Sequence, residues 1–189
     1  MTAETLVSAD PSFKSELLQN LSNLRAFALS LVGRADRADD LVQETIMKAW
    51  SKQESFEMGT NMRAWLFTIL RNEYYSRMRK AGREVSDTDG EYTHTLAVHA
   101  PQEGSMDMQD FQKALEELPD DQREAIILIG ASGFSYEEAA EICGCAVGTI
   151  KSRVSRARLR LQELLGVSGH ADYGPDGNSA AVTGRAFSA

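Results

Sequence analysis

The sequence predicts an all-α protein made of two small helical domains joined by a flexible acidic linker. Apolar residues recur at intervals of three and four through residues 10–83 and 109–165, which is the period of amphipathic helices. Residues 84–108 contain Gly, Pro and many acids without a sustained apolar period, as expected of a linker. Residues 166–189 are rich in Gly, Ser and Ala and predict a disordered tail.

Charge is unevenly distributed along the chain of 189 residues, whose formal net charge is −8. Residues 63–83 carry six bases and one acid, and residues 148–163 carry five bases and one acid. Residues 84–124, which lie between these basic segments, carry twelve acids and two bases. This distribution favours a protein with two separate nucleic-acid contacts and a further protein partner.

Other classes of protein find little support in the sequence. No signal peptide opens the chain and no apolar run reaches membrane-spanning length, so we expect a soluble, cytoplasmic protein without a membrane partner. Cys143 and Cys145 form a C-x-C pair that lacks the other ligands of a structural zinc site, and we interpret them as small core residues. We find no nucleophile–base pair, glycine-rich phosphate loop or metal-ligand spacing, and therefore expect no enzyme activity, cofactor, metal or small-molecule substrate.

Three helices are expected in the first domain. Periodicity predicts one helix from Pro11 to about Val32 and a second over about 35–52, with a loop at 53–61 and a third helix over 62–81. The second helix leaves a polar face outside. This face is either a solvated surface, which the spacing favours, or a docking surface for a basic partner helix; it includes Asp39, Asp40, Gln43 and Glu44.

Aromatic and basic residues are interleaved on the third helix. Rings stack on unpaired bases while neighbouring cations contact phosphates, so this pattern is typical of single-strand binding. It is equally compatible with core aromatics beside a solvated basic face. The residues concerned are Trp65, Asn72, Tyr74 and Tyr75, interleaved with Arg63, Arg71, Arg77 and Arg79.

The end of the second domain predicts a helix-turn-helix. Ser135 and Glu138 form a capping box at the start of a short helix, and Gly144 occupies the position of a left-handed cap at its end. A second helix is expected from about Gly148 to Leu165. A short helix, a tight turn and a second helix form the layout of a DNA reader.

The second of these helices has a basic face beside its apolar stripe. Small residues at its start keep it slim enough for the major groove. The alternative is a solvated surface helix of an ordinary bundle. The candidate DNA contacts are Thr149, Lys151, Ser152, Arg153, Arg156 and Arg158.

Three motifs in order resemble one known family. The runs DDLVQETIMKAW, NMRAWLFTILRNEYYSRMRK and LPDDQREAIILIGASGFSYEEAAEICGCAVGTIKSRVSRAR are similar to bacterial sigma factors of the extracytoplasmic-function group. The second and third runs look closest to the EcfG type, which directs the general stress response. The resemblance covers about residues 12–165.

The resemblance implies a role for each part. Residues 10–83 would be a sigma-2 domain, and residues 109–165 a sigma-4 domain that reads the −35 promoter element with the six residues named above. Asn61 and the interleaved residues of the third helix would recognise and open the −10 element. The docking face for core RNA polymerase would comprise Asp39, Asp40, Leu41, Val42, Gln43 and Glu44.

The implied partners are core RNA polymerase, double-stranded promoter DNA, the melted −10 strand and an anti-sigma factor. A stand-alone helix-turn-helix regulator that binds operator DNA without polymerase is the alternative from another class. A decoy for an anti-sigma factor is a third possibility. The sequence does not determine whether the two domains are open or closed in the free protein.

Overall fold

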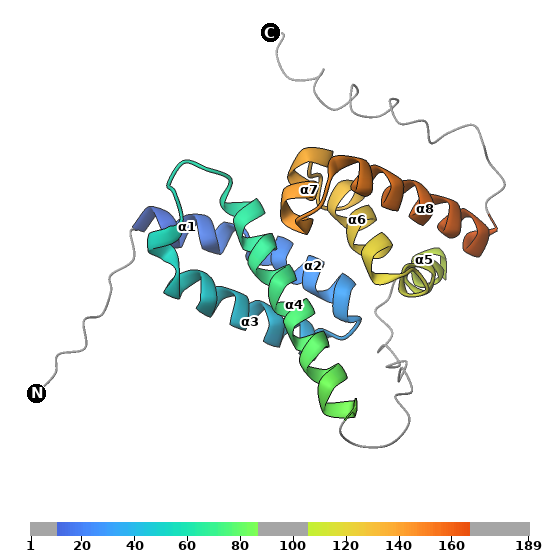
Figure 1. The fold of residues 1–189 in the computed structure, drawn as a ribbon, viewed down its shortest axis with the longest axis horizontal. Helices are drawn as coiled ribbons and strands as arrows, with labels where there is room; N and C mark the ends of the chain where they lie inside the picture. The colour runs from blue at the N-terminus through green and yellow to red at the C-terminus, as the bar shows by residue number, and fades with distance from the viewer. Residues whose placement is uncertain (1–10, 87–105, 167–189) are drawn as a thin grey trace, which may run out of the picture.

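Helices account for every regular element in the part of the chain that the computed structural model describes, residues 11–86 and 106–166 (Figure 1). Most of the expected linker and tail lies outside these residues. The elements are α1 (Pro11–Gln19), α2 (Leu21–Val32), α3 (Ala35–Ser51), a 3-10 turn (Gln53–Ser55), α4 (Met62–Ser86), α5 (Met106–Glu116), α6 (Asp120–Gly130), α7 (Tyr136–Cys143) and α8 (Val147–Leu165). The all-α prediction is therefore confirmed.

The helix expected from Pro11 to Val32 is broken at Asn20, so that prediction was wrong in detail. The Asn20 side chain donates a hydrogen bond to the Glu16 carbonyl at 2.8 Å. Asparagine side chains compete in this way with the helical backbone, and here α1 ends and α2 begins. Gly33 ends α2 as predicted, because its φ of 72° is in the left-handed region.

The first domain packs α1–α4 around one apolar core. Leu24, Leu41, Leu66 and Leu70 are fully buried at its centre. The loop before α4 contributes Phe56, whose ring lies 6.0 Å from Phe13 and 5.0 Å from Trp65. This contact anchors the loop to the core.

The second domain contains the predicted helix-turn-helix. Ser135 and Glu138 form both hydrogen bonds of the capping box at the start of α7, and Gly144 ends that helix with a φ of 62°. The apolar stripe of α8 is buried, from Ile150 to Leu161. Turn and stripe together therefore fix which face of α8 points outward.

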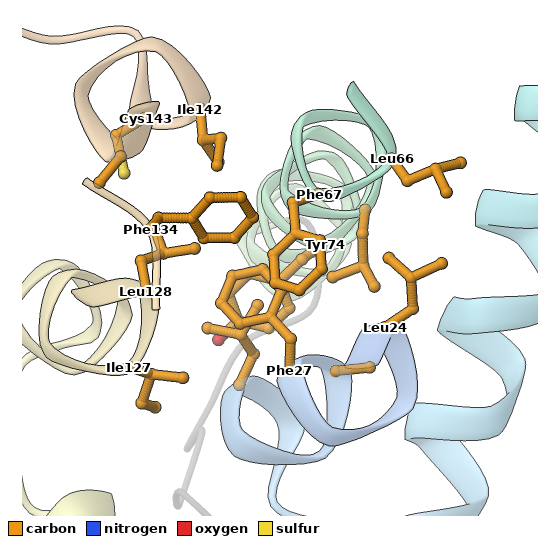
Figure 2. Close-up of a cluster of buried hydrophobic side chains, with 14 of the residues drawn as sticks. Leu24, Phe27, Leu66, Phe67, Tyr74, Ile127, Leu128, Phe134, Ile142 and Cys143 are labelled. Atoms are coloured by element: carbon orange, nitrogen blue, oxygen red, sulfur yellow. The ribbon is translucent and has the colours of Figure 1, made fainter. Parts of the chain in front are cut away.

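The two domains form one packed body. Helix α7 packs against α4, and α6 packs against α2, so the second domain contacts two helices of the first domain (Figure 1). Figure 2 shows Phe134, from the segment between α6 and α7, pointing at Phe67 of α4. The ring centroids of Phe67 lie 4.7 Å from Phe27 and 4.9 Å from Phe134. The described structure is thus the closed arrangement.

Candidate nucleic-acid interface

The basic face of α8 lies on the outside of the molecule. Lys151 and Arg156 are exposed, and Arg158 is half-buried. Lys151 also lies over the ring of Tyr136, 5.7 Å from its centroid. Cations on an open helix surface can reach the phosphates and base edges of a duplex without any rearrangement of the domain.

The start of α8 presents smaller side chains. Thr149 and Ser152 are half-buried, and the Ser152 hydroxyl donates a hydrogen bond to the Thr149 carbonyl at 2.8 Å. This hydroxyl is therefore turned toward its own helix. These small side chains keep the N-terminal end of α8 narrow, as insertion into a major groove requires.

Arg153 differs from the other cations of α8 because it is tied to its own domain. Its Nε lies 3.0 Å from a carboxylate oxygen of Asp121 on α6, and its side chain is 22% exposed. Its Nη1 contacts the sulfur of Cys145 in the turn at 3.8 Å. Arg153 consequently joins three parts of the helix-turn-helix domain.

The start of α4 is fastened to the second domain. The Asn61 side chain accepts a hydrogen bond from the Ala64 amide at 3.0 Å and donates one to Glu138 at 2.7 Å. Arg63 donates to the Ser132 carbonyl, and its guanidinium lies 4.6 Å from the centre of the Phe134 ring. Two candidate −10 residues are thus engaged between domains.

A buried ionic contact follows about two turns further along α4. The Nε of Arg71 lies 2.7 Å from Oε1 of Glu124, and the two side chains are 19% and 0% exposed. The Tyr75 hydroxyl donates to Oε2 of the same carboxylate at 3.3 Å. Burial raises the pKa of Glu124, although Arg71 acts to lower it. Burial, reinforced by Glu124, also raises the pKa of Tyr75.

The remaining candidate residues of α4 are divided among three environments. Trp65 is half-buried in the aromatic cluster of the first domain, and Tyr74 is buried against Tyr75 with ring centroids 5.1 Å apart. Arg77 pairs with Glu44 of α3 at 2.7 Å. Asn72 and Arg79 are exposed.

The polar face of α3 is open. Asp40, Gln43 and Glu44 are exposed, and together with Met47 and Arg77 they line a shallow groove of about 320 Å³. The second domain lies on the other side of α4 from α3 (Figure 1).

The rest of the predicted docking set has other contacts. Asp39 is exposed and pairs with Arg25 at 2.6 Å, which lowers its pKa through that hydrogen bond. Leu41 and Val42 are buried in the domain core, so their part in any docking is to hold α3 in place.

Sequence reasoning missed the acidic residues of the second domain that engage other candidates. Glu124 contacts Arg71 and Tyr75, Glu138 contacts Asn61, and Asp121 contacts Arg153. The one signal in the sequence that could have indicated these contacts is the alternation of acidic and basic segments along the chain. In the described ranges, no helix has the length and apolar character of a membrane span, and no cluster of three His, Cys, Asp or Glu side chains is suited to a metal.

Comparison with known proteins decides the family. A model of sigma-70 region 2 matches residues 17–84, and a model of sigma-70 region 4 matches residues 108–161. An extracytoplasmic-function RNA polymerase sigma factor, EcfG of Rhodopseudomonas palustris, is 57% identical over 92% of this chain and 96% of its own length. The chain belongs to the extracytoplasmic-function sigma factors.

Solved structures agree with this assignment. The sigma factor RpoE of Bartonella quintana, solved in complex with the anti-sigma factor NepR, is 68% identical to this sigma factor. The match has a TM-score of 0.77 and covers 85% of this chain and 100% of RpoE. CnrH, solved with the cytosolic domain of CnrY, is 27% identical with a TM-score of 0.63, over 86% and 93% of the two chains. A sigma factor is the promoter-specificity subunit of RNA polymerase, and this chain has both conserved regions of that subunit.

Proposed function

We propose that this sigma factor directs core RNA polymerase to promoters of a general stress response and that an anti-sigma factor controls it. The observation that carries the proposal is the presence of two basic helices, α4 and α8, in the two matched sigma regions, with an open polar face on α3. The 57% identity to EcfG supports the stress-response type, and the complex of RpoE with NepR supports an anti-sigma partner. The role is non-catalytic, and its site is the cytoplasm, where polymerase and promoter DNA are found.

The residues take the following roles in this proposal. The exposed face of α3 docks on core polymerase, and α8 reads the −35 duplex through Lys151, Arg156 and Arg158, with Arg153 held by Asp121 at its edge. Helix α4 and the loop before it bind the melted −10 strand. Opening a base pair costs a few kcal/mol, so the contact with the −10 strand needs cations and stacking rings. The contact with the −35 duplex needs only a helix in the major groove.

Transcription in vitro with purified core polymerase tests the proposal. Adding the protein should give initiation from a stress-type promoter, and adding a NepR-like anti-sigma protein should suppress it. Core enzyme that gains neither binding nor initiation would refute the sigma-factor role. Initiation that persists unchanged with the anti-sigma protein would refute only the regulatory part.

A variant of the α3 face sharpens this test. Replacing Asp40 and Gln43 together with Ala should weaken binding to core polymerase without loss of helix, because both side chains are exposed. Replacing Glu117, an exposed acid of the second domain, with Ala provides the control. Equal affinities of the two variants for core polymerase would show that docking lies elsewhere.

The stand-alone regulator is the second candidate, because α8 is open in the free protein. It requires tight, sequence-specific binding to duplex DNA by the protein without polymerase. A band shift with the purified protein separates the two functions.

A further inference from the structure

The sequence predicts that Arg77 contacts the −10 strand, whereas in the structure its side chain faces α3. Leu66, Leu70 and Glu73 precede it on α4, and the steps from one to the next are four, three and four residues. All three are buried in the first domain. Residues at these intervals share one face of a helix, so Arg77 continues the face of α4 that packs inside its own domain.

Two carboxylates from different helices share the guanidinium of Arg77. Its Nη2 lies 2.7 Å from Oε1 of Glu44 on α3, and its Nε lies 3.4 Å from Oε1 of Glu73 on α4. Lys48 of α3 pairs with the other oxygen of Glu73, and this hydrogen bond lowers the pKa of Glu73. Burial acts to lower the pKa of Arg77, but its two carboxylate partners raise it. Charges of alternating sign therefore tie α3 to α4.

The same guanidinium lines the open groove of α3. Asp40, Gln43, Glu44 and Met47 form the groove together with Arg77, which comes from α4. The Nη2 of Arg77 also donates a hydrogen bond of 3.4 Å to the carbonyl of Asp40. A partner that enters the groove would thus meet Glu44 already bound to Arg77.

We propose that Arg77 is a positioning residue of the polymerase-docking face, where it holds the carboxylate of Glu44 in the conformation that core polymerase binds. This role rests on the proposed function, because it takes the exposed face of α3 as the docking surface. Arg77 then belongs with the polymerase contacts and not with the −10 contacts. Arg79 follows two residues later on the opposite side of α4 and is exposed, so it remains available to DNA.

Loss of this cation would affect Glu44 in two ways. A glutamate on a helix surface samples several rotamers, and fixing it during binding costs conformational entropy. Arg77 fixes it beforehand, while the half-exposed carboxylate can still accept a bond from a partner. Glu44 also interacts with Glu73, and without the cation between them the two carboxylates would repel and turn Glu44 away.

Two affinities separate a docking role of Arg77 from a DNA contact. One is the affinity of the full-length protein for core polymerase. The other is the affinity of holoenzyme, assembled at saturating core polymerase, for a stress-type promoter fragment with an unpaired −10 segment. Arg77→Ala should weaken the first by about tenfold and change the second by less than about twofold. Unchanged core affinity with a weaker promoter complex would overturn the positioning role.

Arg79→Ala is the matched control, because it removes the same charge from the exposed side of the same helix. It should bind core polymerase as tightly as the unmodified protein. An equal loss of core affinity in both variants would assign the effect to net charge and overturn the role of Arg77.

A double variant tests whether Arg77 acts through Glu44. Glu44→Ala should weaken binding to core polymerase, and adding Arg77→Ala should weaken it by no more than about a further twofold, because the group that Arg77 holds is gone. Losses that multiply in the double variant would overturn the proposal.

Helix content by circular dichroism shows whether each variant remains folded. Should Arg77→Ala lose helix content, Arg77→Lys decides, because lysine keeps the charge beside Glu73 but lacks the planar fork that binds two carboxylates at once. It should bind core polymerase several-fold more weakly than the unmodified protein, and an unchanged affinity would overturn the proposal.

The outcomes also separate this role from the sigma-factor function. Unmodified protein that fails to bind core polymerase would refute the sigma-factor function itself. Unmodified protein that binds core polymerase with the same affinity as Arg77→Ala would overturn only the role of Arg77.

Discussion

Helices α4 and α8 are both basic, but the fold treats their cations differently. The cations of α8 mostly face outward, and Arg156 is exposed on its surface. Those at the start and middle of α4 are engaged by the other domain, where Arg63 contacts Ser132 and Arg71 pairs with Glu124. Positive charge on a helix therefore indicates affinity for an anion without indicating which anion occupies it in the free protein.

The composition of the two helices explains this difference. Helix α4 carries Phe67, Tyr74 and Tyr75 among its cations, and these rings give the second domain an apolar surface on which to pack. Helix α8 has small residues such as Ser152 and Ser155 between its cations, so its outer face has little to bury. Aromatic rings that can stack on bases can equally well bury against protein.

The largest effect is expected from removing the ring at the centre of the domain contact. Phe67→Ala should lower the free energy of unfolding by about 3–5 kcal/mol, because the ring is completely buried between Phe27 and Phe134. Denaturant unfolding measures this change. The matched truncation on the open helix, Leu159→Ala, removes an exposed side chain and should stay within about 0.5 kcal/mol. If both variants lost a similar free energy of unfolding, the conclusion that α4 is packed against the second domain while α8 is open would be contradicted.

A smaller effect is expected for the open face of α8. Arg156→Ala should weaken binding to a −35 duplex by about 1–3 kcal/mol if the side chain contacts a base, without changing the unfolding free energy. Arg153→Ala should also destabilise the domain, because it releases Asp121 and Cys145. Fluorescence anisotropy and thermal melting distinguish the two variants. A stable Arg153→Ala protein would show that its ion pair contributes little.

The pH dependence of closure depends on Glu124. Burial raises its pKa above the ordinary value of 4.5, while Arg71 and Tyr75 of α4 and Cys143 of α7 act to lower it. Burial also raises the pKa of Cys143, to about 12, so this thiol keeps its proton at neutral pH. Glu124 therefore holds its proton more tightly in this structure than a carboxyl group in water does.

Because its pKa is raised, Glu124 stabilises the domain contact more at low pH than at high pH. The contribution of Glu124 to the domain contact is fully present below its ordinary pKa and is lost as the pH rises through its raised pKa. Each unit between these two pKa values corresponds to about 1.4 kcal/mol. The radius of gyration should thus increase as the pH rises above the ordinary pKa of 4.5. Glu124→Gln cannot titrate and should flatten the profile. An identical profile in that variant would assign the pH dependence to other groups.

The smallest effect is expected where the start of α4 meets α7. Asn61→Ala removes a helix cap and should cost about 1 kcal/mol of stability. Asn61→Ser keeps a capping oxygen but is too short to reach Glu138, so it should differ from the unmodified protein by only a few tenths of a kcal/mol. Thermal melting of the two variants separates the cap from the domain contact. Equal losses would show that the hydrogen bond to Glu138 contributes most of the stability.

The sequence by itself determined the local structure of this protein. The capping box of Ser135 and Glu138, the left-handed Gly144 and the apolar stripe from Ile150 to Leu161 depend on residues within a few positions of one another. Short-range spacing is sufficient for such features, because helix caps and faces are set by neighbours along the chain. The break at Asn20 escaped prediction, since helical periodicity continues across it.

Only the tertiary structure decided which candidate residues are open. Arg71 and Glu124 are more than fifty positions apart, and Asn61 and Glu138 are still more distant, yet each pair is in direct contact. Charge and periodicity place a cation on a helix face, but they do not determine what packs against that face. That choice depends on the apolar surface buried between the domains, which exists only after both have folded and met.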